Sequence, residues 1–245
     1  MTGAGIPHTA MILAAGYGKR MQPLTLATPK PLLHVGGKAM LDHVLDRLRE
    51  VGVMRAVVNA GYLGDQIVAH VASCRDPAII ISREMPPLET GGGVKLALPL
   101  LGDDPIYVLN ADLPWQDATI PALQRMRAAW DSARMDVLLL LMPAERTNGF
   151  SPKGDFDLSP DGHAQRHHHP PPYSHVFIGV FIVKPQLYRA MTAETFSNNV
   201  IFDQAEAANR LFACVHDGTC YHVGTPEDLA QANALLMSGR GWNKP

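Results

Sequence analysis

The most informative segment of the sequence is Met11-Ile-Leu-Ala-Ala-Gly-Tyr-Gly-Lys-Arg-Met-Gln-Pro-Leu-Thr-Leu-Ala-Thr-Pro-Lys-Pro-Leu32. Its apolar start is bounded at once by glycines, which is the pattern of a short buried strand. The loop that follows carries Gly16 and Gly18, and then basic side chains at Arg20 and Lys30. Because glycine lets backbone N–H groups approach a ligand closely, such a loop favours an anion. We therefore expect a phosphate-binding loop directly after a buried strand.

This loop is neither of two common phosphate motifs. A Walker loop needs Gly-Lys-Ser/Thr, and Gly-Tyr-Gly-Lys-Arg-Met lacks the third glycine of a dinucleotide fingerprint. Its cations still suit phosphate, because an arginine such as Arg20 donates in a bidentate fork and a lysine such as Lys30 supplies a point charge. A dinucleotide-dependent dehydrogenase is therefore a weak alternative.

The composition describes an ordinary globular chain without a strong overall field. The chain has 245 residues and a net charge of −2, so any anion site must be local rather than a basic surface for nucleic acid or a membrane. Its three cysteines occupy unrelated contexts, which favours reduced thiols and a cytoplasmic location. No apolar run has transmembrane length, and residues 1–9 lack the apolar core of a signal peptide. We expect a disordered tail over 1–9 and one domain over 10–245.

Strands and helices alternate along the chain, which predicts an α/β fold with a mostly parallel sheet and helices on both faces. The expected strands are 10–15, 54–59, 78–82, 106–109, 135–142 and 176–183, and the expected helices are 39–51, 64–72, 94–101, 120–130, 186–190 and 201–209. Asp217-Gly218 predicts a hairpin between 211–215 and 220–223. Thr225, as N-cap before Pro226, predicts a last helix.

Three polar segments follow predicted strands and can meet in one cleft. In parallel sheets ligands bind beyond the carboxyl ends of the strands. The glycine loop, the loop 84–93 and Asn110-Ala-Asp112 all occupy such positions. Asp112 can hold Mg²⁺ through one carboxylate, since Mg²⁺ takes one or two carboxylates together with waters and substrate phosphates. A helix or turn cap is the alternative role for Asp112.

The whole N-terminal segment resembles the signature of the sugar-1-phosphate nucleotidyltransferases. The resemblance is carried by Leu13-Ala-Ala-Gly-Tyr-Gly-Lys-Arg-Met, by Pro23-Leu-Thr and by Pro29-Lys-Pro-Leu. It implies a Rossmann-like three-layer sandwich with a mostly parallel mixed central sheet and a small C-terminal sugar-binding portion. It further implies a nucleotide half over about 10–143 and a sugar and metal half over about 144–245. The implied reaction condenses a nucleoside triphosphate with a sugar 1-phosphate, giving a nucleoside-diphosphate sugar and pyrophosphate.

The resemblance also implies a role for individual residues. Arg20 would bind the β- and γ-phosphates, Lys30 the α-phosphate, and Asp112 the Mg²⁺ ion, with Mn²⁺ as an alternative metal. The remaining implied contacts are those to the nucleotide (Ala14, Ala15, Gly16, Gly18, Glu84, Gly91 and Gly92) and to the sugar (Asn110 and Gly154).

Two segments narrow the substrate pair by resemblance. Leu88-Glu-Thr-Gly-Gly-Gly93 and Lys153-Gly-Asp-Phe156 are most similar to the subset that joins UTP to N-acetylmuramic acid 1-phosphate in cell-wall sugar recycling. GTP with mannose 1-phosphate, or another pair, remains an alternative, because glycine loops discriminate bases poorly. An alternative of another class is a nucleotide-binding regulatory domain without turnover. We expect a monomer or homodimer with no nucleic-acid or membrane partner.

Two departures from the family pattern bear on the site. His222, in Cys220-Tyr-His-Val-Gly-Thr225, stands where close relatives carry a second metal-binding aspartate. Imidazole suits softer ions such as Mn²⁺ or Zn²⁺, so His222 either binds the metal, contacts phosphate, or stays outside the site. His168-His169-Pro170 stands in place of the family's Glu-Lys-Pro, and a solvated loop over His167–His169 is the alternative to a phosphate contact.

Overall fold

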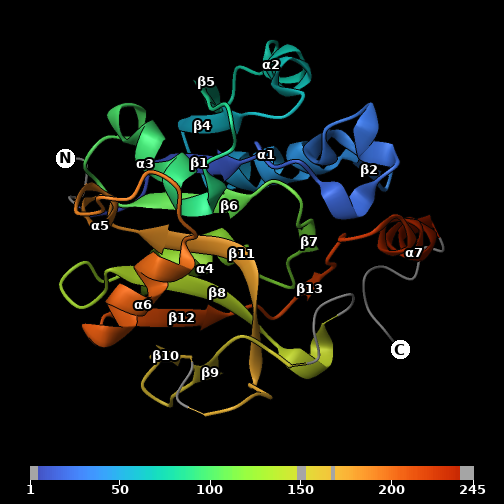
Figure 1. The fold of residues 1–245 in the computed structure, drawn as a ribbon. Helices are drawn as coiled ribbons and strands as arrows, with labels where there is room; N and C mark the ends of the chain where they lie inside the picture. The colour runs from blue at the N-terminus through green and yellow to red at the C-terminus, as the bar shows by residue number, and fades with distance from the viewer. Residues whose placement is uncertain (1–4, 148–152, 167–168, 238–245) are drawn as a thin grey trace.

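The computed structural model describes residues 5–147, 153–166 and 169–237 (Figure 1). The strands are β1 (Thr9–Leu13), β2 (His34–Val35), β3 (Lys38–Ala39), β4 (Arg55–Ala60), β5 (Ala78–Arg83), β6 (Ile106–Asn110), β7 (Trp115–Gln116), β8 (Val137–Pro143), β9 (Asp157–Leu158), β10 (Ala164–Gln165), β11 (His175–Val183), β12 (Leu211–Val215) and β13 (Thr219–Cys220). The α-helices are α1 (Met40–Glu50), α2 (Gly64–Val71), α3 (Glu89–Leu101), α4 (Ala122–Ala129), α5 (Gln186–Arg189), α6 (Asn199–Ala207) and α7 (Pro226–Met237). Short 3₁₀ turns are η1 (Lys19–Met21), η2 (Leu24–Leu26), η3 (Lys30–Leu32) and η4 (Ala144–Arg146).

A seven-stranded mixed sheet runs through the molecule in the order β12-β8-β11-β6-β1-β4-β5. The strands from β6 to β5 are parallel, and β12 is parallel to β8. Only β11 in this sheet runs against its neighbours, β6 and β8. The mostly parallel sheet expected from the sequence is confirmed.

Helices cover both faces of this sheet. Successive side chains of each strand point to opposite sides, and both sets are apolar, so each face buries against helices. On one face α1, α2 and α4 pack against strand residues such as Ile12 and Leu138. On the other face α3, α5 and α6 pack against the alternate residues, such as Met11 and Leu139. The three-layer arrangement is therefore confirmed (Figure 1). In the described residues, no helix combines the length and apolar character needed to cross a membrane.

The predicted hairpin around Asp217-Gly218 is wrong. β12 instead pairs in parallel with β8 at the sheet edge, while β13 pairs with β7 outside the sheet. Two arginines bind the segment that connects β12 to β13. Arg125 donates to the Asp217 carboxylate, and Arg146 donates to the Asp217 carbonyl. Two arginine contacts and two separate pairing partners thus outweigh the local turn preference.

The C-terminal helix α7 lies beside the N-terminal β2, although the two are far apart in the sequence (Figure 1). Tyr221, Val223 and Ala232 bury against Met21 and Val35 in a small separate core. Residues near the end of the chain are thereby carried to the loop that follows β1.

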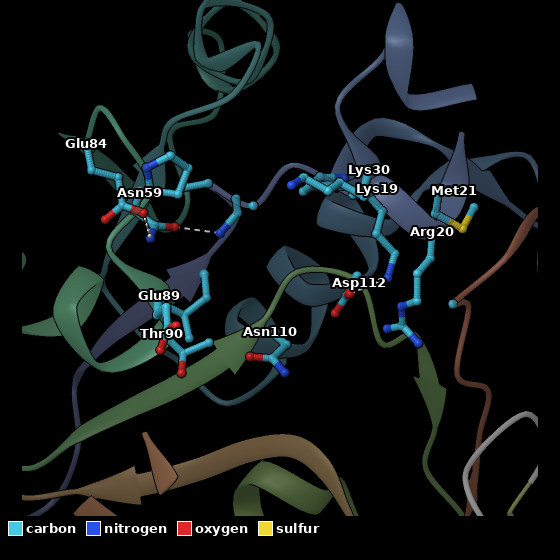
Figure 2. A pocket seen from close by; sticks show the side chains of 18 residues that line it. Lys19, Arg20, Met21, Lys30, Asn59, Glu84, Glu89, Thr90, Asn110 and Asp112 are labelled. Carbon is cyan, nitrogen blue, oxygen red and sulfur yellow. Dashed lines mark hydrogen bonds and ion pairs between the residues drawn. The ribbon is translucent and has the colours of Figure 1, made fainter. Parts of the chain in front are cut away.

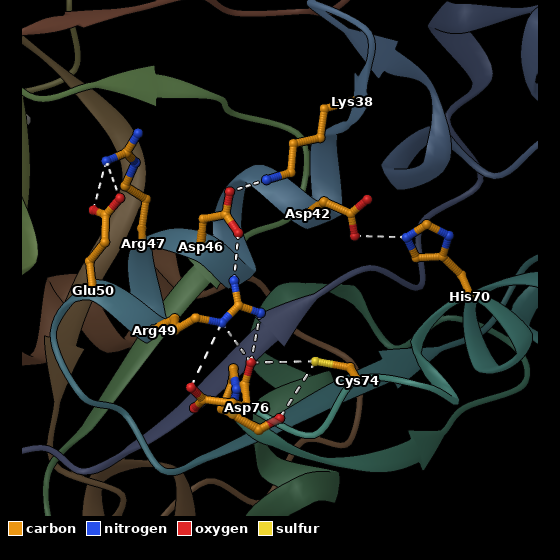
Figure 3. A network of polar contacts seen from close by, with 10 residues as sticks. Lys38, Asp42, Asp46, Arg47, Arg49, Glu50, His70, Cys74 and Asp76 are labelled. Carbon is orange, nitrogen blue, oxygen red and sulfur yellow. Dashed lines mark hydrogen bonds and ion pairs between the residues drawn. The ribbon is translucent and has the colours of Figure 1, made fainter.

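A surface network fixes α1 to the segments around it (Figure 3). The Asp46 carboxylate accepts from Lys38 and Arg49, and Arg49 also donates to the Asp76 carbonyl. Asp42 pairs with His70 of α2 at 2.8 Å. These contacts are exposed and lie outside the central cavity, so their role is to hold elements together.

Of the tail expected to be disordered, residues 1–4 lie outside the described part. Residues 5–9 are described: Thr9 begins β1, and the His8 carbonyl accepts the Met54 N–H. Thr9 therefore belongs to the sheet and not to the tail, and the disorder expected of the tail stays a prediction.

Candidate active site

A cavity of about 380 Å³ opens where β1 and β6 end (Figure 2). These strands are parallel neighbours, with Leu13 opposite Asn110. The residues that line the cavity are Leu13, Ala14, Ala15, Gly16, Gly18, Lys19, Arg20, Met21, Lys30, Pro31, Asn59, Glu84, Pro87, Glu89, Thr90, Asn110, Asp112 and Gly224. The three polar segments expected to converge do so at the carboxyl edge of the sheet.

The loop after β1 is held in one conformation by its own contacts. Gly18 has φ +61°, and a Cβ there would lie 2.9 Å from Cγ2 of Thr25. The Thr25 hydroxyl donates to the Gly18 carbonyl at 2.9 Å. Glycine is needed here because the left-handed conformation and the close approach both disfavour a side chain. The turn η1 that follows buries Met21 and leaves Arg20 exposed on the cavity wall.

Lys30 and Asp112 meet across the cavity as an ion pair. Lys30 Nζ lies 2.5 Å from Asp112 Oδ2, and only 10% of the lysine side chain is exposed. Asp112 follows β6, and the Ala111 N–H donates to the Leu13 carbonyl, which ties this segment to β1. One carboxylate and one ammonium therefore face each other beside Arg20 (Figure 2).

Glu84 lies at the opposite end of the cavity, beside Asn59 (Figure 2). Burial raises the pKa of the Glu84 carboxyl, although hydrogen bonds from the Leu88 backbone and Asn59 oppose the rise. The Asn59 amide donates to Glu84 Oε1 at 3.3 Å, and its own oxygen accepts the Ala14 N–H at 2.5 Å. Sequence reasoning missed Asn59; the available signal was a polar residue near the end of an otherwise apolar strand.

Gly91 and Gly92 were expected in a loop against the nucleotide base, but α3 already begins at Glu89. Their N–H groups donate to the Phe196 carbonyl at 2.8 and 3.1 Å, and neither residue lines the cavity. A Cβ at Gly91 would lie 2.9 Å from that same carbonyl oxygen. These glycines permit close packing of α3 against the Phe196 carbonyl, and Glu89 and Thr90 from the same motif line the cavity. The nucleotide contact expected of Gly91 and Gly92 stays a prediction.

Gly154 lies away from the cavity lining. It has φ +65°, and a Cβ there would lie 3.0 Å from the His175 carbonyl oxygen. Its sugar contact stays a prediction. Residues 148–152, which precede Gly154 in the chain, lie outside the described residues.

Of the histidine segment, His167 and His168 lie outside the described residues, and His169 is described. His169 Nε2 is 2.8 Å from Asp157 Oδ2, and Nδ1 is 2.6 Å from the Pro170 carbonyl oxygen. These contacts, first the Pro170 carbonyl and then Asp157, raise the pKa of His169. Both ring nitrogens of His169 therefore have partners close to its own loop, at Asp157 and Pro170.

His222 lies next to the cavity wall without being part of the lining. Gly224 lines the cavity, and a Cβ on it would come within 2.7 Å of His222 Nε2. Burial first, and then the charges of Lys30 and Arg20, lower the pKa of His222 against the opposing effect of Asp112. These effects together favour the neutral imidazole over the imidazolium.

Asp112 is the single carboxylate at the end of this lining that carries Arg20 and Lys30. Within 5–147, 153–166 and 169–237, no three His, Cys, Asp or Glu side chains gather in a way that could hold a metal ion. A metal held only by protein groups is thus not indicated in the described part. One carboxylate suits an ion that takes its other ligands from water and substrate phosphate.

Comparison with known proteins matches the chain to the MobA-like NTP transferase domain over residues 10–223. The N-acetylmuramate alpha-1-phosphate uridylyltransferase of Caulobacter vibrioides is 40% identical over 94% of this chain and 97% of its own. Its counterpart from Neisseria meningitidis serogroup B is 34% identical over 92% and 97%. Among solved structures, the UDP-glucose pyrophosphorylase from Acinetobacter baumanii superposes with a TM-score of 0.78 at 16% identity, over 97% and 96% of the two chains. That structural likeness concerns the fold.

Proposed function

The chain belongs to the MobA-like NTP transferase domain family, and from this premise we propose that it transfers a uridylyl group from UTP to N-acetylmuramate α-1-phosphate. The products are the UDP-sugar and pyrophosphate, and the reaction returns a cell-wall sugar to the nucleotide-activated pool. The observation that carries the proposal is the 40% identity to a uridylyltransferase across nearly all of both chains.

The two ends of the cavity suit the two ends of a nucleoside triphosphate. Arg20 and Lys30 lie at one end and Glu84 at the other, with the backbone of the glycine loop between them (Figure 2). We assign Arg20 to the β- and γ-phosphates, Lys30 to the α-phosphate and Glu84 to the base. The sugar 1-phosphate would enter beside Asn110, which lines the cavity at the end of β6.

The reaction needs alignment more than acid–base chemistry. A phosphate oxygen of the sugar attacks the α-phosphorus in line, and pyrophosphate leaves from the opposite side. Since this nucleophile is already an anion, no side chain has to remove a proton from it. Holding two mutually repelling anions in line can lower the barrier by about 7–11 kcal/mol. Arg20 and Lys30 provide positive charge where negative charge develops.

A divalent metal fits the donor set at Asp112. The single carboxylate, with phosphate oxygens and water, matches the preference of Mg²⁺. Such an ion supplies neutralisation of charge on the triphosphate when bound. We propose Mg²⁺ as the physiological metal and Mn²⁺ as an active substitute, with His222 as the group that would favour Mn²⁺ if it reaches the ion.

The remaining aspects of the proposal are cellular. We propose a cytoplasmic enzyme that acts as a monomer or homodimer on two small anionic substrates. The three cysteines are free thiols, as the cytoplasm favours.

Pyrophosphate release tests the proposal directly. We expect turnover with UTP and N-acetylmuramate 1-phosphate in Mg²⁺ or Mn²⁺, and at least about tenfold less with GTP and mannose 1-phosphate. Asp112→Ala and Arg20→Ala should each lower turnover by about a hundredfold or more while the circular dichroism spectrum is unchanged. Preference for the guanosine pair would replace the proposal by the guanylyltransferase alternative. Nucleotide binding without turnover on any pair would favour the regulatory one.

A further inference from the structure

Asn59 occupies a position between the two loops that form the nucleotide end of the cavity. It is 2% exposed, near the end of β4, which lies between β1 and β5 in the sheet. The loop after β1 begins with Ala14, and the loop after β5 begins with Glu84. Asn59 contacts one residue from each loop, as the dashed lines of Figure 2 show.

These two contacts require a carboxamide. Asn59 Oδ1 accepts the Ala14 N–H at 2.5 Å, and Asn59 Nδ2 donates to Glu84 Oε1 at 3.3 Å. A carboxylate at this position has acceptors only, and an aliphatic side chain has neither group. We propose that Asn59 is a positioning residue for the nucleotide: it sets the distance between the glycine loop and the Glu84 carboxylate.

The third glycine of the Leu88–Gly93 motif supports this role. A Cβ at Gly93 would lie 2.8 Å from Asn59 Nδ2 and 3.0 Å from Glu84 Oε2. A methyl group there would have to displace the pair. The bare Cα lets α3 pack closely over the amide and the carboxylate, so the third glycine of the motif has a structural reason of its own.

The inference rests on the proposed function, because it assumes that a nucleotide spans Ala14 and Glu84. If a nucleotide spans these two residues, breaking the Asn59–Glu84 contact should weaken UTP binding and leave the KM for the sugar 1-phosphate unchanged. The loss should also depend on which group stands at position 84, because the partner decides whether a donor is needed.

A double-mutant cycle tests this dependence through the calorimetric Kd for UTP. Asn59→Asp keeps the acceptor for Ala14 but sets a carboxylate against Glu84, so we expect Kd to rise at least about tenfold. In a chain that also carries Glu84→Gln, the new amide can donate to the new carboxylate. The same Asn59→Asp change should then cost less than about threefold. The KM for the sugar 1-phosphate should stay within about twofold throughout.

Asn233→Asp is the matched control. Asn233 Oδ1 accepts the Gly36 N–H at 2.8 Å, and Nδ2 donates to the His34 carbonyl, so its bonding resembles that of Asn59 outside the cavity. It should lower the melting temperature without changing the UTP affinity. Equal losses of UTP affinity in Asn59→Asp and Asn233→Asp would assign Asn59 a merely structural role and overturn the inference.

Gly93→Ala gives a second test if Asn59→Asp does not fold. Alanine favours a helix over glycine by about 1 kcal/mol, so helix α3 itself should not be weakened. We expect a rise of about tenfold in the Kd for UTP, because the methyl group displaces the pair.

The remaining outcomes separate the role of Asn59 from the proposed function. An unchanged Kd in Asn59→Asp or in Gly93→Ala, or equal penalties in both backgrounds of the cycle, overturns the role of Asn59 alone. The proposed function alone is overturned if the wild-type protein binds UTP and the double-mutant cycle gives the expected Kd values, but no pyrophosphate is released. A wild-type protein that does not bind UTP overturns both.

Discussion

Lys30 neutralises Asp112 in the nucleotide-free protein. The two charged atoms lie 2.5 Å apart in a largely buried position. Because an ammonium and a divalent cation repel each other at one carboxylate, a metal gains full access to Asp112 only when Lys30 turns away. The α-phosphate that we assign to Lys30 would give it another anion. Nucleotide and metal should therefore strengthen each other's binding, and thermodynamic linkage makes this effect reciprocal.

Lys30→Met tests that coupling. The substitution removes the ammonium but keeps an unbranched apolar stem, so Asp112 becomes available without nucleotide. We expect the affinity of the nucleotide-free protein for Mn²⁺, measured by electron paramagnetic resonance, to rise about tenfold. Turnover should fall about a hundredfold, because the phosphate contact is lost. Lys38→Met, whose ammonium pairs with Asp46 on the surface, is the control and should change neither quantity. A lower or unchanged Mn²⁺ affinity in Lys30→Met would contradict the coupling.

The sequence locates single residues best where one continuous motif carries them. Arg20, Lys30 and Asp112 line one cavity, as the signature and the strand-end rule predicted. Asn59 was missed because its importance comes from lying between two loops, which only the strand order reveals. The start of α3 at Glu89 was missed because the partner of the Gly91 and Gly92 N–H groups, the Phe196 carbonyl, lies far along the chain.

At the level of elements, the first turn of α7 holds a part of the cavity wall. Asp228 Oδ2 accepts the N–H groups of Gly224 and Thr225 at 3.0 and 2.9 Å. Thr225 Oγ1 in turn accepts the Asp228 N–H at 3.2 Å, which completes a reciprocal cap. The predicted N-cap is thereby confirmed. Since Gly224 lines the cavity, the cap links the stability of α7 to the site.

Asp228→Ala should therefore affect both stability and substrate binding. Losing the cap should reduce the free energy of unfolding by about 1 kcal/mol. The freed Gly224 backbone should raise the KM for UTP several-fold, about as far as one weakened contact allows. Asp228→Asn retains a side-chain oxygen for these N–H groups and should recover most of both losses. Urea unfolding and initial-rate kinetics measure the two effects. An intact KM in Asp228→Ala would mean that Gly224 is held without the cap.

The elements that sequence reasoning misplaced share one property. The turn at Asp217-Gly218 and the triple glycine both carry strong local signals for turns, yet distant partners decide their structure. Arg125 and Arg146 hold the first segment open, and Phe196 receives the N–H groups of the second. Elements with periodic apolar patterns, such as α1 and β8, were predicted nearly to their ends because their own side chains form the core.

For the whole molecule, the sheet joins the two halves that the sequence suggested. β8 belongs to the first half, yet it lies between β12 and β11 of the second, and β11 continues the sheet to β6. A strand of one half cannot unfold without exposing strands of the other half to solvent. We therefore expect the chain to unfold as one cooperative unit.

Asp136 offers a test of that unit through pH. Its carboxylate accepts from Lys184 at the end of β11 and pairs with Arg210 before β12, at 2.8 and 2.9 Å. Burial alone would raise the pKa of Asp136, but these two cations outweigh it, and the pKa falls below its ordinary value of 3.8. The ionised form is thus stabilised by folding. This contribution is complete above the ordinary pKa and disappears as the pH falls through the lower folded-state pKa.

Asp136→Asn should therefore be less stable than the wild type at pH 7, by on the order of 1 kcal/mol for a partly exposed network. The difference should shrink steadily below about pH 4, because the carboxyl takes up a proton in the unfolded chain at a higher pH than in the folded protein. Urea unfolding from pH 7 to pH 3, followed by fluorescence and circular dichroism, measures it, and both signals should change in one transition. Asp65→Asn, at an exposed pair with Arg83, controls for the general effect of removing an acid. A stability difference that persists undiminished at pH 3 would mean that the Asp136 charge does not hold β8, β11 and β12 together. Two separate transitions would mean that the halves unfold independently.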